Sequence, residues 1–294
     1  MAYSRGVTLA SFRRSPAISG PLRNLTVVCK ETFVVHSKTA PTRKITTGPV
    51  SAGTNGRTVH NKILLGLPAK ERHAIISKLE FVSLPVPLAL TEEGVRIKYA
   101  YFINDGLASA LKVMHDGNCA EVGLRGREGF VGLPLVAGFS TSSSRIIMQV
   151  GGSGFRASAK DLAATLEKCP ALMKCLRRFA QESALQAEQI AACDRLHSVD
   201  ERLATWLLMC QDRLGGDVVP LTHTFLSHML GTRRASVTEA AGALQKAKLI
   251  TCARGRVTVR SRKKLEDAAC ECYAMLKQQI EKWNRETCRN GNRR

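Results

Sequence analysis

Apolar residues in the last third of the chain recur first at helical spacing and then at strand spacing. A helix is expected after Thr222, a good N-cap, and Gly231 ends it because glycine takes a left-handed backbone without steric cost. A second helix, from about residue 233 to 246, carries one apolar stripe made of Val237, Ala240, Ala241 and Leu244. Residues 249–260 then alternate between apolar and polar around an Arg-Gly turn, which predicts a β-hairpin. This order of elements predicts a winged helix-turn-helix, whose second helix is shaped to lie in a DNA major groove.

Residues 81–156 show a different pattern, in which short apolar runs alternate with turn residues. The expected strands are 82–90, 97–103, 107–114, 120–124 and 145–150. Turns between them are indicated by Asn104-Asp105-Gly106, Asp116-Gly117-Asn118, Gly126 and Gly151-Gly152. Short strands at roughly ten-residue spacing predict a small β-barrel or β-roll. Two short helices are expected before it, opening at Asn61 and at Leu67-Pro68.

A long helix is expected from about residue 171 to 196. Its inner positions recur at alternating steps of four and three residues, which is heptad spacing, and the apolar ones include Leu172, Leu176, Phe179 and Ile190. The middle of this stripe is polar, because Ser183 and Gln186 occupy it. The spacing fits a dimer seam, and it also fits a helix that packs only against its own β-roll.

The charge of the chain favours a polyanionic partner, with nucleic acid before an anionic membrane surface. The 294 residues carry a formal net charge of +20, and the pI is near 9.9. From residue 231 to 264, ten Lys and Arg residues stand against one acid, Glu239, which is the pattern of a phosphate-backbone binder. The alternative is a helical hairpin with a solvated charged face. No apolar run approaches the roughly 20 residues of a membrane helix, so no membrane partner is expected.

The chain resembles the Crp/Fnr family of bacterial transcription regulators in two segments, HSVDERLATWLLMCQDRLG and PLTHTFLSHMLGTRRASVTEAAGALQKAKLI. The resemblance implies an α+β protein with an N-terminal β-roll of the cyclic-nucleotide-binding type, a long dimerisation helix and a C-terminal winged helix-turn-helix. It implies a regulator that binds a pseudo-palindromic site on double-stranded DNA as a homodimer and works with RNA polymerase. The expected domains are a disordered basic tail or mis-assigned start at 1–59, the β-roll at 60–160, the linker and dimer helix at 161–196, the DNA-binding domain at 197–275 and a basic tail at 276–294.

In the family, outward residues at the start of the second motif helix read base edges. The corresponding residues here are Arg234, Ala235, Ser236, Thr238 and Glu239. Arg234 matches the family's first reading arginine, which can bond guanine O6 and N7 together. Ala235 stands where members often carry an acid and Glu239 where they often carry arginine, so a different target sequence is expected. Glu239 could accept from a cytosine amino group, or it could pair with Arg233 or Lys246.

Phosphate contacts are expected from five residues: Thr222, Arg233, Arg254, Arg256 and Lys264. Such contacts position a protein on the duplex without specifying its sequence. The alternative function is a ligand-sensing module whose basic wing binds RNA or an anionic membrane surface rather than duplex DNA.

The resemblance also implies an effector pocket in the β-roll, at Gly129, Gly132, Leu133 and Arg145. A cyclic nucleotide needs a glycine-rich turn, a carboxylate for the ribose hydroxyl and an arginine for the phosphate. The glycines are present, but Leu133 and Pro134 occupy the place of the glutamate, and Arg145 is at best one position out of register. We therefore expect that cyclic AMP does not bind, and the sequence indicates no other effector.

The ten cysteines show no paired C-x-x-C spacing, and the chain has no secretory signal with a proper apolar core. Reduced thiols in the bacterial cytoplasm are therefore expected. Cys169, Cys175, Cys270 and Cys272 are interpreted as packing or surface thiols without ligand-rich surroundings, so neither a metal nor a cofactor is expected. The chain has no P-loop, HExxH or GxSxG motif, and we expect no enzymatic activity.

The first 59 residues hold nine Lys and Arg against one acid, Glu31. This composition is typical of an organellar transit peptide as well as of a disordered basic tail. Because the rest of the chain resembles a bacterial family, a tail or a start set too far upstream is the preferred interpretation.

Overall fold

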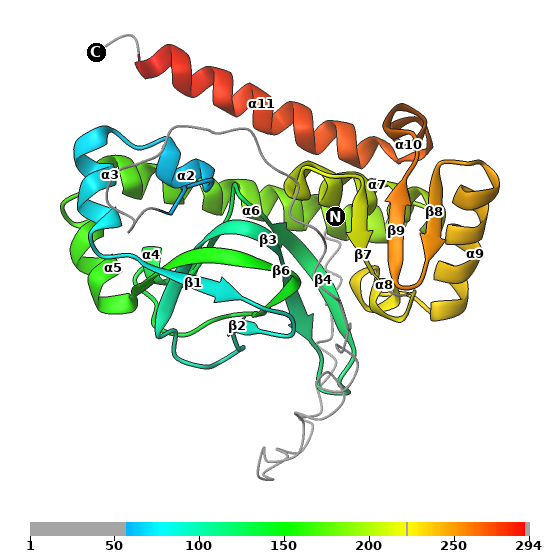
Figure 1. Ribbon diagram of the computed structural model, residues 1–294, viewed down its shortest axis with the longest axis horizontal. Coiled ribbons are helices and arrows are strands. Elements are labelled where there is room, and N and C mark those ends of the chain that lie inside the picture. Colours follow the sequence, from blue (N-terminus) through cyan, green and yellow to red (C-terminus); the bar gives the residue numbers. More distant parts are fainter. Residues whose placement is uncertain (1–56, 222, 292–294) are drawn as a thin grey trace, which may run out of the picture.

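The computed structural model describes residues 57–221 and 223–291, and the predicted basic segment before residue 57 lies outside them. Figure 1 shows two lobes, a β-roll and a smaller helical domain, connected by the long helix α6 (Pro170–Leu196). This arrangement confirms the predicted α+β fold class. Within the described ranges, no helix is long and apolar enough to cross a membrane.

The β-roll is a six-stranded antiparallel sheet. Its strands are β1 (Glu80–Leu84), β2 (Ala89–Thr91), β3 (Tyr99–Val113), β4 (Cys119–Arg125), β5 (Phe130–Val131) and β6 (Arg145–Ser158). The main path runs β1-β6-β3-β4, while β2 pairs with β6 and β5 with β3. Four short helices lie at one end of the roll: α2 (Lys62–Leu65), α3 (Ala69–Ile76), α4 (Leu133–Val136) and α5 (Ala159–Leu166).

Two predicted turns lie inside continuous strands, so these two predictions were wrong. The segment Asn104-Asp105-Gly106 bends β3 at a register shift against β6. Gly106 has φ +90°, and a Cβ there would lie 2.6 Å from the carbonyl oxygen of Val150. Across the sheet, a Cβ on Gly152 would overlap the carbonyl of Asp105. Both glycines allow two backbones to approach closely, and neither reverses the chain.

The C-terminal lobe is built from helices around a small sheet. Its helices are α7 (Val199–Leu214), α8 (His223–Met229), α9 (Arg234–Lys246) and α10 (Arg262–Ala268). Its sheet has the order β7-β9-β8, with β7 (Val218–Pro220), β8 (Ile250–Ala253) and β9 (Arg256–Val259). Helix α7 opens with the predicted capping box, in which the Ser198 backbone N–H donates to Glu201 Oε2 at 2.9 Å.

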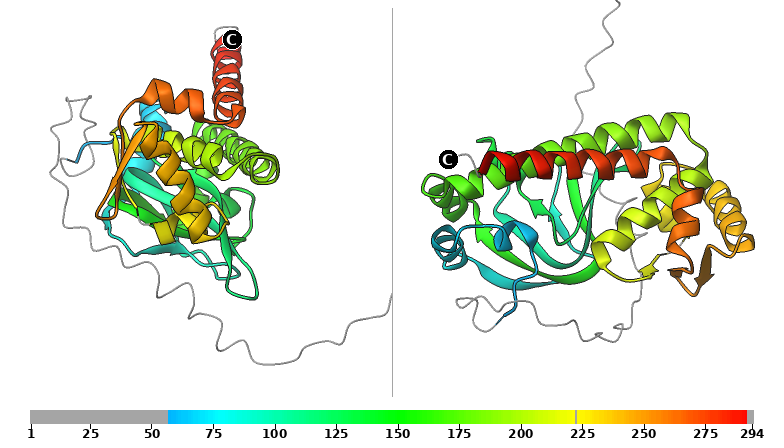
Figure 2. Two further views of the ribbon diagram at one scale, coloured as in Figure 1. Left: turned by 90° about the vertical axis from the view of Figure 1, so that its right-hand side faces the viewer. Right: turned by 90° about the horizontal axis from the view of Figure 1, so that it is seen from above.

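The sequence predicts a closing helix over residues 265–283, and the structure has two helices here, the second of which extends through the segment expected as a basic tail. Helix α11 (Glu271–Gly291) follows α10 after a break at Ala269, whose backbone is extended. Tyr273 and Leu276 are buried, and Ile280 packs against the same core, so one face of the first half of the helix is held against the protein. Figures 1 and 2 show α11 running back along α6 towards the β-roll.

Candidate nucleic-acid interface

Helices α8 and α9 form the predicted helix-turn-helix. Gly231 between them has φ +55°, as expected for the residue that ends a helix. The Thr232 backbone N–H donates to the carbonyl oxygen of Ser227 at 3.0 Å, which closes the turn. The predicted inner stripe of α9 is buried in the core of the lobe: Val237, Ala240, Ala241 and Leu244. Burial of this stripe fixes which face of α9 points outward.

The predicted base-reading residues share the outer face of α9. Arg234, Ala235, Thr238 and Glu239 are exposed, and Ser236 is half-buried. The Thr238 hydroxyl donates to the carbonyl oxygen of Arg234 at 3.0 Å, so part of its hydrogen-bonding capacity is used within the helix. Within the described residues, no ion pair joins Glu239 to Arg233 or Lys246. The first two turns of α9 therefore present one arginine and one carboxylate on the same exposed face.

Two of the predicted phosphate contacts, Arg254 and Arg256, lie on the wing, and a third, Lys264, lies on α10. Arg254 and Gly255 form its turn with φ +46° and +74°, a pair of positive values that a tight hairpin turn requires. Arg254, Arg256 and Lys264 are exposed, as is Arg233 at the N-cap of α9. Thr222 lies outside the described residues. The sequence did not indicate β7, the third strand of the wing sheet, because it is three residues long and includes a proline.

Arg262 lies among these basic residues but is bound within the protein. Its Nη2 is 2.7 Å from Asp212 Oδ1 and its Nε is 3.0 Å from Glu266 Oε1. The side chain also donates to the hydroxyl of Tyr273, and that hydroxyl donates to Asp212 at 2.8 Å. Arg262 thus joins α7, α10 and α11, and it contributes less to a phosphate-binding surface than its charge suggests.

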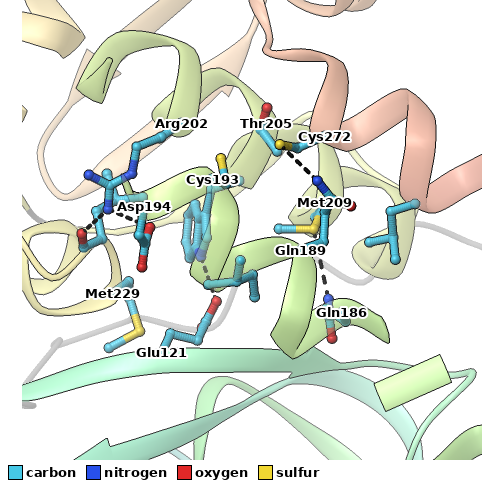
Figure 3. A pocket seen from close by; sticks show the side chains of 14 residues that line it. Glu121, Gln186, Gln189, Cys193, Asp194, Arg202, Thr205, Met209, Met229 and Cys272 are labelled. Atoms are coloured by element: carbon cyan, nitrogen blue, oxygen red, sulfur yellow. Dashed lines mark hydrogen bonds and ion pairs between the residues drawn. The ribbon is translucent and has the colours of Figure 1, made fainter. Parts of the chain in front are cut away.

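The C-terminal lobe is docked on the β-roll through buried polar contacts as well as apolar ones. The indole N–H of Trp206 on α7 donates to Glu121 Oε1 on β4 at 2.8 Å. Arg202 lies 2.6 Å from Asp194 at the end of α6 and donates to the carbonyl oxygen of Leu230, beside the motif turn. Figure 3 shows these side chains around a cavity of about 30 Å³, which has room for one water. The position of the motif therefore depends on α6 and β4.

Residues of the predicted effector segment take part in the hydrogen bonding and packing of the β-roll. The carbonyl oxygen of Gly129 accepts from the Asn61 side chain at 2.9 Å, and Leu133 begins α4 and packs against a core. Arg145 lies 3.4 Å from Glu92, with its side chain only 14% exposed. The one arginine among the four predicted residues is therefore already paired with a carboxylate.

The predicted dimer seam faces the protein's own core, and this assignment was wrong for three of its four residues. Leu172 and Leu176 are fully buried, and Phe179 is 6% exposed, all in a core shared with the β-roll. Ile190 is half-buried and lines the cavity beside α7. The heptad spacing correctly marked the buried side of α6, but spacing does not show which element covers that side. The opposite side of α6 is the exposed one.

The prediction of ligand-poor surroundings for Cys270 and Cys272 was also wrong. Cys193, His197, Cys270 and Cys272 bring their ligand atoms within 4.8 Å of one another. The signal was present as two short spacings, Cys-x-x-x-His and Cys-x-Cys, which are 73 residues apart between His197 and Cys270. No local pattern indicated that the two spacings meet, because their meeting depends on the return of α11 to α6.

Comparisons with known proteins agree with this architecture. Residues 201–268 match the family model of the Crp-like helix-turn-helix domain. The chain therefore has a helix-turn-helix domain of the Crp type. The predicted resemblance is therefore confirmed.

Solved structures of the Crp/Fnr type share the fold over most of their length. A Crp/Fnr-family regulator from Eubacterium rectale has a TM-score of 0.57 at 14% identity, over 71% of this chain and 98% of its own. FixK2 from Bradyrhizobium japonicum has a TM-score of 0.57 at 16% identity, over 65% and 98%. A Crp/Fnr-family regulator from Thermus thermophilus has a TM-score of 0.55 at 21% identity, over 65% and 98%. No curated protein matches the chain.

Proposed function

We propose that the protein is a sequence-specific Crp/Fnr-type regulator that reads a pseudo-palindromic duplex as a homodimer in the bacterial cytoplasm. The observation that supports this most directly is the outer face of α9, where Arg234, Thr238 and Glu239 are exposed beside the basic wing. A helix presented in this way fits the major groove, and the wing arginines fit the adjacent phosphates. RNA polymerase is the further partner that the resemblance implies.

Selection of bound duplexes from a random pool tests this proposal, because every possible target sequence competes in the same pool. We expect an enriched motif with a guanine in each half, since Arg234 can bond O6 and N7 of that base. The enriched duplex and a scrambled one are then compared at the same salt concentration, together with single-stranded RNA and anionic vesicles. Equal affinity for both duplexes would contradict the proposal, and preference for RNA or vesicles would favour the alternative function.

The homodimer that we propose uses the exposed side of α6. This side carries a stripe of exposed residues: Arg177, Gln181, Ala184, Glu188, Ala191 and Arg195. The stripe includes small alanine side chains that allow two helices to approach closely, and it includes charges of both signs. One motif per chain covers one half-site, so a two-fold pair of chains is needed for a palindrome.

We further propose that cyclic AMP is not the effector. Leu133 supplies no carboxylate for the ribose hydroxyl, and Arg145 is already paired with Glu92. Two unmet polar groups would cost about 2–6 kcal/mol, enough to turn a micromolar site into a millimolar one. Calorimetry with cyclic AMP should therefore show no micromolar binding. Micromolar binding that Arg145→Ala abolishes would contradict this view.

A further inference from the structure

Four side chains with metal-binding atoms converge where α6 ends and α11 begins. Cys193 lies in the last turn of α6, and His197 is the residue that ends it. Cys270 lies in the break between α10 and α11, and Cys272 lies in the first turn of α11. The three cysteines are buried and the histidine is half-buried. The cysteines form a buried cluster of their own, apart from the apolar cores.

The spacing of these atoms matches the edges of a tetrahedron around a single ion. The Sγ atoms of Cys193 and Cys270 are 3.4 Å apart, and Cys272 Sγ is 3.5 Å from His197 Nδ1. All four ligand atoms lie within 4.8 Å of one another. Zinc bonds of about 2.3 Å to sulfur and about 2.0 Å to nitrogen give tetrahedral edges of roughly 3.5–3.8 Å. The cluster is therefore close to the size of a mononuclear zinc site.

The histidine is held in the tautomer that a metal requires. His197 Nε2 lies 3.1 Å from Glu271 Oε2, so this nitrogen donates its hydrogen to the carboxylate. The other ring nitrogen, Nδ1, is then the one with a lone pair, and it is the nitrogen that faces Cys272. A carboxylate behind a metal-binding histidine is the usual way in which proteins fix the ring and raise its basicity.

Hydrogen-bond donors also face the sulfur atoms. The side-chain amide of Gln189 donates to Cys272 Sγ at 3.1 Å, and Figure 3 shows this bond on the wall of the neighbouring cavity. The Thr205 hydroxyl lies 3.1 Å from Cys270 Sγ. Cys272 lies in the first turn of a 21-residue helix, where the backbone dipole favours negative charge. Donors placed in this way are able to hydrogen-bond to metal-bound sulfur.

We propose that Cys193, His197, Cys270 and Cys272 bind one Zn²⁺ ion in a tetrahedral Cys₃His site. The set of three thiolates and one imidazole closes all four positions, which is typical of a structural zinc site and not of a catalytic one. Binding releases the thiol protons to solvent and involves no change of oxidation state. The ion would join the end of α6 to the start of α11, so it fixes the C-terminal helix against the connection between the two lobes.

The test is the zinc content of the full-length chain, purified under mild reductant and measured by mass spectrometry of the metal. We expect about one zinc per chain, lost in Cys193→Ser and Cys272→Ser. Cys252→Ser is the matched control, because this half-buried wing thiol lies outside the cluster and should leave zinc unchanged. Cobalt in place of zinc should give the visible absorption of tetrahedral thiolate coordination in the control and not in Cys272→Ser.

Glu271→Gln keeps all four ligands, so it tests the site in a variant that is expected to fold. It therefore separates a loss of zinc binding from a loss of zinc caused by misfolding. We expect it to retain the fold and to bind zinc about 10–100-fold more weakly in competition with a chelator. Several results would overturn the proposal: a folded chain that retains no zinc, equal zinc in Cys272→Ser and in the control, or iron in place of zinc. A disulfide between Cys193 and Cys270 in the purified, metal-free protein would also overturn it.

Discussion

Glu121 on β4 is 2% exposed, and its carboxyl group accepts a hydrogen bond from Trp206 across the boundary between the lobes. Burial raises the pKa of this carboxyl to about 8 from 4.5, although Ser109, Trp206 and Arg213 act in the opposite direction and Asp194 adds to the rise. The folded protein therefore holds a proton that the unfolded chain releases at neutral pH. The stability from this group is fully present below pH 4.5 and is lost as pH rises through about 8.

Glu121→Gln should remove this part of the pH dependence, because glutamine imitates the protonated acid and cannot ionise. We expect the variant to match the wild type near pH 4.5 and to unfold at a higher temperature above pH 8. Thermal unfolding followed by circular dichroism across this range measures the difference. Parallel curves for the two proteins would mean that Glu121 titrates normally in the folded state.

Replacement of Arg234 and replacement of Arg254 should weaken duplex binding in different ways. Arg234→Ala should cost about 1–3 kcal/mol on the selected duplex and relax the preference at one base pair, because a base contact is lost. Arg254→Ala should weaken all duplexes alike and reduce the salt slope by about one, because a phosphate contact is lost. Affinities for the selected duplex and its single-base variants at several salt concentrations separate the two. A uniform loss for Arg234→Ala would show that it contacts only phosphate.

Residue-scale contacts of this kind were the least predictable from the sequence. Arg234 and Arg254 could be placed because helical periodicity and hairpin chemistry set their exposure locally. The pairing of Glu121 with Trp206 joins residues 85 apart, and the meeting of Cys193 with Cys270 joins residues 77 apart. Nothing in the spacing along the chain encodes such meetings, because they depend on how the lobes dock.

At the scale of elements, most helices and the wing could be predicted, and the errors share one cause. The spacing of apolar residues in α6 indicated which side of the helix is buried. It did not indicate that the β-roll of the same chain covers that side in the N-terminal half of α6. The Asn-Asp-Gly and Gly-Gly segments predicted chain reversals. In the structure, their glycines instead allow the backbones of β3 and β6 to lie close together. In both cases the sequence indicated which residues are special, a buried stripe or flexible glycines. It did not indicate the element that packs against them, because that element is distant in the sequence.

The exposed side of α6 gives a test of the dimer. Ala184→Arg should separate the chains, because the substitution places a bulky cation of each chain in the middle of the proposed seam. Sedimentation velocity should show monomers, and binding to the palindromic duplex should fall. Ala274→Arg is the matched control, since Ala274 is an exposed alanine on α11. Dimers that persist in Ala184→Arg would place the interface elsewhere.

At the scale of the whole molecule, the proposed dimer would present two motifs, and their separation would set the geometry of the target. Half-sites read by a two-fold dimer should lie about 10 bp apart, centre to centre, so that both face the protein. Insertion of roughly half a turn, about 5 bp, should reduce binding to that of a single half-site, and a full turn should restore part of it. Mobility-shift titrations with spaced duplexes measure this. Binding that is indifferent to spacing would show that the two motifs move independently.

Helix α11 has a consequence for how the DNA-binding lobe can move. A lobe attached to the β-roll only through the chain at the end of α6 could swivel about that point in any direction. Because α11 returns along α6, the lobe is attached along a second line as well. The lobe is also held at β4, where Trp206 donates to Glu121. These attachments lie on different sides of residue 197, so the chain at that residue does not act as a free hinge and the two lobes are expected to turn as one body.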